Sequence, residues 1–184
     1  INKFDDNEAR FGKVLDALHD KFGKSVCPLT IPMVKNGEVV GAIDLVEQTA
    51  HVFDNNGRHS VEMIPEESLE ATNHFRDMLM EAVASADEDL MMKFFDGEPL
   101  TDEEIDRGLK TGILAGDICP VYACSGYLVE AVDLINNSIV QSAPDAASVA
   151  SEGDLTPDEN APLAAICFKT VADPFVGKMS YFKV

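Results

Sequence analysis

The chain has 184 residues, which suits one domain, or one domain and part of a second. Aspartate and glutamate outnumber lysine and arginine by 33 to 14, and the formal net charge of −19 argues against a free-standing nucleic-acid-binding protein, which needs clustered cations at phosphates. Apolar residues make up 46% of the chain, enough for a sizeable core, and we expect no membrane segment because no run reaches the roughly 18 apolar residues that a membrane helix requires.

The first five residues place an apolar residue before the sequence Asn-Lys-x-Asp. We expect Ile1 to end a buried strand and the polar residues to follow in a loop. An ionised carboxylate such as that of Asp5 accepts two parallel N–H bonds, and guanine offers this pair of donors while adenine does not. Asn2 would bond the ring acceptors or brace the loop, and the stem of Lys3 would lie against the flat ring. Taken alone, such a stretch more often forms a polar loop that caps a helix.

A helix is predicted next. Apolar residues recur at helical spacing over 11–22, polar residues at 5–7 offer N-caps, and Gly23 is expected to end the helix. The apolar run 26–33 contains two prolines, which favours either an edge strand or two short strands.

A small antiparallel sheet follows in the prediction. Asn36-Gly37 is a strong hairpin-turn signal and leads to a strand over 39–46. Further strands are predicted over 49–53 and 61–64, with a turn at 54–57 between them.

The periodicity then becomes helical. Pro65 opens a helix that we expect to end near Ser85, a second helix is predicted over 87–95, and Thr101 with Glu104 forms the capping box of a third. Methionines in these helices could form an adaptable binding surface, but we expect them to fill the core. They are Met78, Met80, Met91 and Met92.

The last third of the chain begins with a buried strand predicted over 118–124 and a tight loop at Ser125-Gly126, followed by an amphipathic helix over 128–139. From 141 to 160 the sequence is rich in Ser, Ala, Pro, Asp and Glu, which is typical of a linker or a mobile loop. Two strands, 162–171 and 176–184, are predicted to end the chain. Two strands alone are marginally stable, so we expect the chain to be cut from a longer protein.

Cysteines and histidines give little sign of chemistry. We expect reduced thiols in or near the core of a cytoplasmic protein, with zinc binding as the minor alternative, because the cysteines are scattered. They are Cys27, Cys119, Cys124 and Cys167. The histidines have no nucleophile motif beside them, and we expect them to be exposed to solvent, with no catalytic residue and no metal ligand assigned.

The stretch from Phe168 to Val184 contains Phe-Lys, then Asp-Pro-Phe-x-Gly, then an apolar strand with a basic residue near its end. It closely resembles the opening of the second domain of bacterial elongation factor G. Further matches to that family run in order through essentially the whole chain. They are Pro32, Gly41 and Ile43-Asp44-Leu45, then Leu100-Thr101 with Glu103, Glu104 and Ile105, then Pro120-Val121 and Ser125.

The resemblance implies that Asn2, Lys3 and Asp5 read a guanine base. It also implies that Ser125 and Gly126 form the second guanine-binding loop, in which a backbone N–H meets the guanine O6. The ligands of the intact parent would be GTP or GDP with Mg²⁺. A phosphate loop of the Gly-x-x-x-x-Gly-Lys-Ser/Thr kind is absent from the 184 residues, so we expect this chain alone to hydrolyse no GTP and to bind guanine nucleotides weakly.

The fold class implied by the resemblance is α/β, as an α+β fragment. Residues 1–37 and 119–141 would form the C-terminal part of a P-loop GTPase domain, and 38–118 an α+β insertion subdomain. Residues 142–161 would be a linker, and 162–184 the first strands of a β-barrel second domain.

The implied parent is a cytoplasmic translational GTPase that acts on the ribosome, in a translocation-type step. Its insertion would contact the ribosomal stalk protein, and neither a membrane nor free nucleic acid is expected as a partner. The alternative is a non-hydrolysing interaction module that docks a protein. The sequence departs from the family pattern at Gly126, where Ala is usual, and at 128–131, where Leu-Val-Glu-Ala replaces a Lys-Asn-Lys-Gly type of sequence. These changes indicate a divergent paralogue.

Overall fold

The computed structural model describes residues 1–53, 59–144, 160 and 162–183. These residues form a mixed α and β structure with three separate sheets. The chain divides into two compact units, Ile1–Ala143 and Pro144–Val184, and each is described by itself. None of the helices in the described ranges is long and apolar enough to span a membrane.

Helix α1 (Phe11–Phe22) has an apolar stripe that buries Leu15. It ends at Gly23, whose φ of 76° suits a residue without Cβ. The N-caps expected at 5–7 are wrong, because the cap position is Arg10, which makes no side-chain cap bond. Asp6 instead closes the preceding turn by accepting a hydrogen bond from the Glu8 N–H at 2.8 Å.

The apolar run 26–33 forms two short strands, one of the two predicted alternatives. Strand β1 (Val26–Pro28) pairs in parallel with β6 (Cys119–Val121), and β2 (Thr30–Lys35) enters another sheet. Leu29 lies between them and donates its N–H to the Val121 carbonyl at 2.8 Å. The strand predicted over 118–124 is therefore shorter than expected, because regular pairing ends after Val121.

Strand β2 begins a four-stranded antiparallel sheet of order β2-β3-β4-β5. The other strands are β3 (Glu38–Asp44), β4 (Thr49–Phe53) and β5 (His59–Glu62). The predicted hairpin turn is confirmed, since Asn36 and Gly37 have φ of 52° and 87°, the left-handed values that a tight two-residue turn requires. The turn predicted at 54–57 lies outside the described residues.

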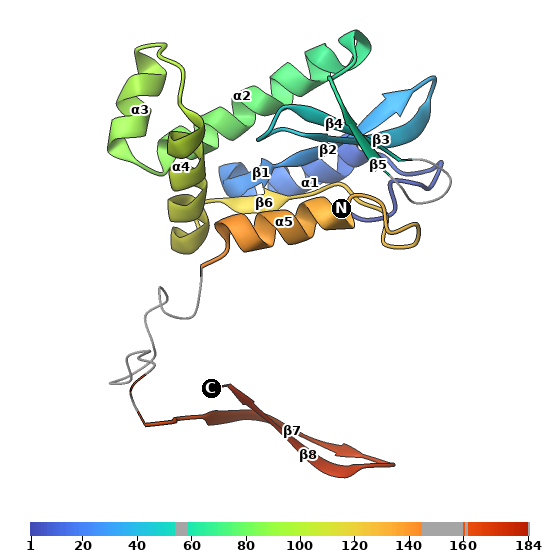
Figure 1. The fold of residues 1–184 in the computed structure, drawn as a ribbon, viewed down its shortest axis with the longest axis vertical. Coiled ribbons are helices and arrows are strands. Elements are labelled where there is room, and N and C mark those ends of the chain that lie inside the picture. Colours follow the sequence, from blue (N-terminus) through green and yellow to red (C-terminus); the bar gives the residue numbers. More distant parts are fainter. Residues whose placement is uncertain (54–58, 145–159, 161, 184) are drawn as a thin grey trace. The chain divides into compact units, whose positions relative to one another are not determined.

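The helices predicted after Pro65 are present. A short 3-10 helix (Glu66–Ser68) leads into α2 (Leu69–Ser85), followed by α3 (Glu88–Phe95) and α4 (Asp102–Ala115). The capping box of α4 is confirmed: Thr101 Oγ1 accepts from the Glu104 N–H and the Glu104 carboxylate accepts from the Thr101 N–H. Figure 1 shows α3 and α4 at one end of the first unit, away from the N-terminus.

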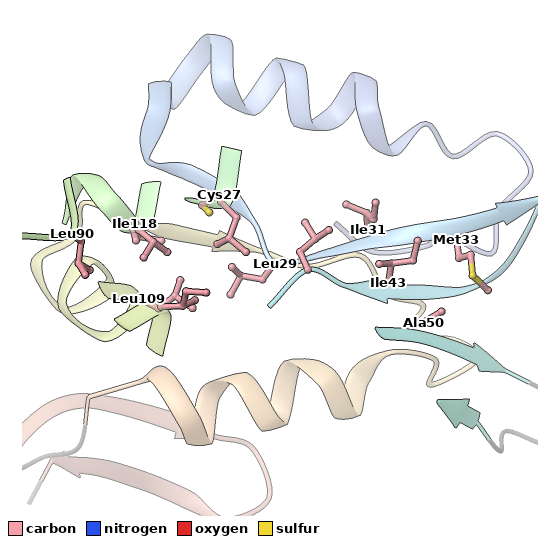
Figure 2. Packing of buried hydrophobic residues seen from close by; sticks show 13 residues of the cluster. Cys27, Leu29, Ile31, Met33, Ile43, Ala50, Leu90, Leu109 and Ile118 are labelled. Carbon is pink, nitrogen blue, oxygen red and sulfur yellow. The ribbon is translucent and has the colours of Figure 1, made fainter. Parts of the chain in front are cut away.

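Helix α5 (Val132–Ser142) starts later than the prediction, which placed Leu128 in it. Val129 and Ala131 have φ of 61° and 58°, outside the right-handed helical region, so the chain turns before the helix begins. Figure 2 shows α1 and α5 on opposite sides of the β1–β6 pair.

A continuous core joins β1–β4 to helices α2–α4 (Figure 2). Cys27, Leu29 and Ile31 from the first strands belong to the same cluster as Leu79 of α2 and Leu109 of α4. The cluster therefore draws residues from both sides of the boundary expected at 37/38. The division of this unit into a GTPase part and an insertion stays a prediction.

Two expectations about core residues are confirmed only in part: Met80 packs against the core cluster and Cys27 belongs to it, but other methionines and cysteines do not. Met91 and Met92 are exposed on α3, at 36% and 61%, because the buried side of that short helix is occupied by Leu90. Among the cysteines, Cys27 is buried and burial raises the pKa of its thiol to about 12, but Cys119 and Cys167 are exposed. All four cysteines are free thiols.

The second unit contains the hairpin of β7 (Ile166–Asp173) and β8 (Gly177–Lys183). Asp173 orders its turn by accepting hydrogen bonds from the Phe175 and Val176 N–H groups at 2.8 and 2.9 Å, and these bonds lower the pKa of its carboxyl. Both predicted strands are thus present with shifted ends. Most of the linker expected at 142–161 lies outside the described residues.

Candidate functional site

The N-terminal stretch lies beside the chain that continues from β6. The Ile1 backbone nitrogen donates to the Tyr122 carbonyl at 2.6 Å, and the Cys124 N–H donates to the Ile1 carbonyl at 3.1 Å. The Phe4 N–H donates to the Cys124 carbonyl at 3.2 Å, and the Phe4 side chain is buried. These bonds fix the backbone of residues 1–4 although the Asn2 and Lys3 side chains are exposed.

Asn2 links the two predicted guanine loops. Its Oδ1 accepts from the Gly126 N–H at 2.8 Å and from the Lys3 N–H at 2.7 Å. Of the two roles predicted for Asn2, the structure shows the bracing one. The Gly126 N–H is therefore occupied, and a guanine O6 would have to replace or share Asn2 as its acceptor.

Ser125 begins the second loop and is fully buried. Its N–H and carbonyl exchange backbone hydrogen bonds with Glu130 at 3.1 and 3.0 Å. Its Oγ accepts from the Leu128 N–H at 3.1 Å. These bonds close residues 125–130 into a compact loop whose N-terminal end, at Gly126, meets Asn2.

Lys3 and Asp5 both expose their side chains. Lys3 has a φ of 66°, a left-handed conformation that is uncommon for a residue other than glycine. Asp5 also affects the carboxyl group of Glu130. Burial raises the pKa of the Glu130 carboxyl, and the negative charge of Asp5 raises it further. Asp5 is the predicted acceptor of the guanine edge, and it interacts electrostatically with a second acid.

An open hollow of about 930 Å³ lies against the first loop. Asn2, Lys3 and Asp5 contribute to its lining, together with residues of α1 and of the β2–β3 hairpin. Ser125 and Gly126 do not line it. The structure therefore brings the two loops together at Asn2 and Gly126, but of these two loops only the first contributes to the lining of the hollow.

Glu130 was missed by sequence reasoning, although it carries a usable signal. It stands within the stretch 128–131 that departs from the family pattern, and the departure exchanges a cationic type of residue for an acid beside Asp5. This change weakens the attraction of the site for any anionic ligand.

A buried histidine was also missed. His51 is 8% exposed, contrary to the expectation of exposed histidines. Its Nε2 lies 3.2 Å from Thr49 Oγ1, while its Nδ1 has no hydrogen-bond partner among the described residues. Its ring lies 5.4 Å from that of His59, whose Nδ1 is 3.5 Å from an Asp133 carboxylate oxygen. Alternating strand positions gave no sign that α5 would cover this face.

The described residues contain no group of three or more His, Cys, Asp or Glu side chains arranged to hold a metal ion. For a guanine base, the exposed carboxylate of Asp5 and the Asn2–Gly126 pair have the required chemistry.

Comparison with known proteins gives a structural relation. No family model matches the chain. A crystal structure of a protein from Thermus thermophilus matches with a TM-score of 0.80 and 26% sequence identity. The match covers 97% of this chain and 26% of the other, so this chain spans about a quarter of the length of the protein that it matches.

Proposed function

We propose that this chain is the base-reading part of an elongation-factor-G-like translational GTPase. The observation that carries the proposal is the 2.8 Å hydrogen bond from the Gly126 N–H to Asn2 Oδ1. It joins the two loops that the resemblance assigns to guanine, although they lie 124 positions apart in the sequence. In the intact parent these loops would read GTP or GDP held with Mg²⁺, and the protein would act on the ribosome in the cytoplasm.

The chemistry assigns one role to each residue. The carboxylate of Asp5 accepts from the guanine N1–H and exocyclic amine, and the stem of Lys3 covers one face of the ring. Asn2 holds the second loop through the hydrogen bond that its Oδ1 accepts from the Gly126 N–H. Ser125 stabilises the same loop by accepting a hydrogen bond from the Leu128 N–H. When the base enters, its O6 shares the Gly126 N–H with Asn2 Oδ1 or displaces Asn2 from it.

Nucleotide binding by NMR titration of this chain tests the base-reading role. We expect GDP to bind weakly and about ten-fold or more tightly than ADP, because one bidentate base contact discriminates by roughly 1–3 kcal/mol. Asp5→Asn exchanges one acceptor oxygen for a donor, so it should weaken GDP binding and favour xanthosine diphosphate, whose 2-oxo group accepts. Asp6→Asn is the matched control, since the neighbouring Asp6 uses only one side-chain oxygen, toward the Glu8 N–H.

Equal affinity for GDP and ADP would overturn the base-reading role. So would an Asp5→Asn variant with unchanged preference. Sub-micromolar GDP binding by this chain would contradict the assignment of most of the affinity to phosphate contacts outside it.

The ribosomal role concerns the expected insertion, residues 38–118. We propose that this segment docks the ribosomal stalk protein. The support is its exposed, acidic helical surface, which suits a partner with basic groups. A pull-down with purified stalk protein tests the contact, and absence of binding at high micromolar concentration would count against it.

The second candidate is an interaction module that hydrolyses no GTP. The observation that favours it is the repulsion between Asp5 and Glu130, which raises the pKa of the Glu130 carboxyl after burial has done so and which disfavours an anionic ligand at the base site. Ribosome-stimulated GTP hydrolysis by the full-length gene product separates the two: a translational GTPase releases phosphate, and an interaction module binds ribosomes without doing so.

A further inference from the structure

The outward face of α3 is apolar. Leu90 is fully buried and marks the side of the helix that faces the core. With about 100° between successive residues, the opposite side holds Met91, Met92 and Phe95. Their exposures are 36%, 61% and 78%. A surface helix normally carries polar side chains on this side, so α3 departs from the usual pattern.

Acidic residues precede, interrupt and follow α3 in the sequence, and we call them the acidic rim of this face. Between Asp87 and Lys110 the sequence has nine carboxylates and three cations. Each of the three cations is paired within the segment. Lys93 lies 2.8 Å from Glu104 and Lys110 lies 2.7 Å from Asp106. Arg107 is paired more loosely, at 3.8 Å from Asp87. Six exposed acids are left to set the charge around α3. They are Glu88, Asp89, Asp96, Glu98, Asp102 and Glu103.

We propose that the α3 face (Met91, Met92 and Phe95) docks a basic amphipathic helix of a protein partner. Two methionines give an adaptable apolar surface, and Phe95 supplies a large anchor beside them. The acidic rim pairs with Lys or Arg on the flanks of the incoming helix and steers its approach. The inference rests on the docking role proposed for residues 38–118, and it names the surface and the chemistry of the partner.

Charge selects this occupant over two others. A second copy of the chain would bring an identical acidic rim against the first, and like charges would repel. An anionic membrane surface would be repelled for the same reason. A helix with one apolar and one cationic face satisfies both the apolar side chains and the rim.

The test uses the full chain with labelled methionine methyl groups. The probe is a synthetic leucine–lysine peptide about four turns long that forms an amphipathic helix, and the control peptide has the same composition in scrambled order. We expect the amphipathic peptide to move the Met91 and Met92 methyl signals at near-physiological salt. Met63, which is 92% exposed outside α3, should report only non-specific contact and stay in place.

Variants locate the binding face. Phe95→Ser and Met92→Ser should each weaken peptide binding by about ten-fold, as expected for anchor residues. Phe22→Ser on α1 is the matched control, because Phe22 is also largely exposed, at 61%, and should leave the affinity unchanged. Circular dichroism verifies that each variant keeps its helices.

Three outcomes would overturn the inference: equal binding of the amphipathic and scrambled peptides, unchanged affinity after Phe95→Ser and Met92→Ser, or a dimer of the unliganded chain that Phe95→Ser dissolves. Stalk protein that binds the Phe95→Ser variant as it binds the wild type would remove the α3 assignment while leaving the proposed docking role intact. The nucleotide experiments are unaffected by any of these results.

Discussion

Gly126 stands where the resembled family has Ala, and its surroundings accept that side chain. An added Cβ would lie 3.4 Å from Asn2 Oδ1, an ordinary contact, and Gly126 does not have a positive φ. We expect Gly126→Ala to raise the free energy of unfolding by about 0.5–1 kcal/mol, because Ala restricts the unfolded chain. Urea denaturation of the wild type and of Gly126→Ala measures this difference in the free energy of unfolding. Gly116→Ala is the control with the opposite sign, since Gly116 has a φ of 81°, and a destabilised Gly126→Ala protein would show that the loop is already strained.

Val129 is a β-branched residue with a φ of 61° in an exposed position. The left-handed conformation costs roughly 1–2 kcal/mol for such a residue and much less for Asn. Val129→Asn should therefore raise the unfolding free energy by about 1 kcal/mol. Val140→Asn, at an exposed site within the right-handed helix α5, should give no such gain. Equal effects at the two positions would contradict the strain at Val129.

Two helical glycines should respond oppositely to the same substitution. In α4, a Cβ on Gly112 would meet Ile118 Cδ1 at 2.5 Å, and Ile118 is buried, so Gly112→Ala should destabilise the protein by about 1–3 kcal/mol through overpacking. In α1, Gly12 has nothing within 4 Å of that position, so Gly12→Ala should stabilise by about 0.5–1 kcal/mol through helix propensity. Thermal denaturation of both variants measures the difference, and a common sign would exclude close packing of α4 on Ile118.

The elements that could be predicted were those whose signals are local. The turn at Asn36-Gly37 and the capping box at Thr101 depend on neighbouring residues, and both are present. The late start of α5 could not be predicted, because the left-handed residue Ala131 is buried and its conformation is imposed by packing. For the candidate site, the motif identified Asn2 but not its contact with Gly126, which depends on the path of the whole intervening chain.

At the scale of the molecule, acid should destabilise the first unit through His51. Burial lowers the pKa of His51 below its ordinary value of 6.5, and His59 adds to this effect, while Asp44 and Asp133 oppose it. The folded state thus binds the proton less readily than the unfolded chain. The contribution of neutral His51 to the free energy of unfolding is therefore complete above about pH 6.5. It declines as the pH falls through that value toward the pKa of His51 in the folded state.

Urea denaturation at about pH 7.5 and about pH 5.5 measures this decline, and His51→Gln should flatten it. His74→Gln, at an exposed site on α2, should leave the pH dependence as in the wild type. The lowered pKa of Glu104, caused mainly by its bond to Lys93, acts in the same direction but below about pH 4.5, so the two effects separate. A His51→Gln protein with an unchanged slope would assign the decline to another group.

The continuous core beneath β1–β4 and α2–α4 has a consequence for how this unit opens. Leu29 and Ile31 share one apolar cluster with Leu79 and Leu109, so the helices cannot detach without exposing the strands. The backbone amides of both regions should therefore exchange their hydrogens with solvent through one common opening reaction, with the same free energy. Amide hydrogen exchange that released α4 well before β2 would show instead that the unit unfolds in two stages.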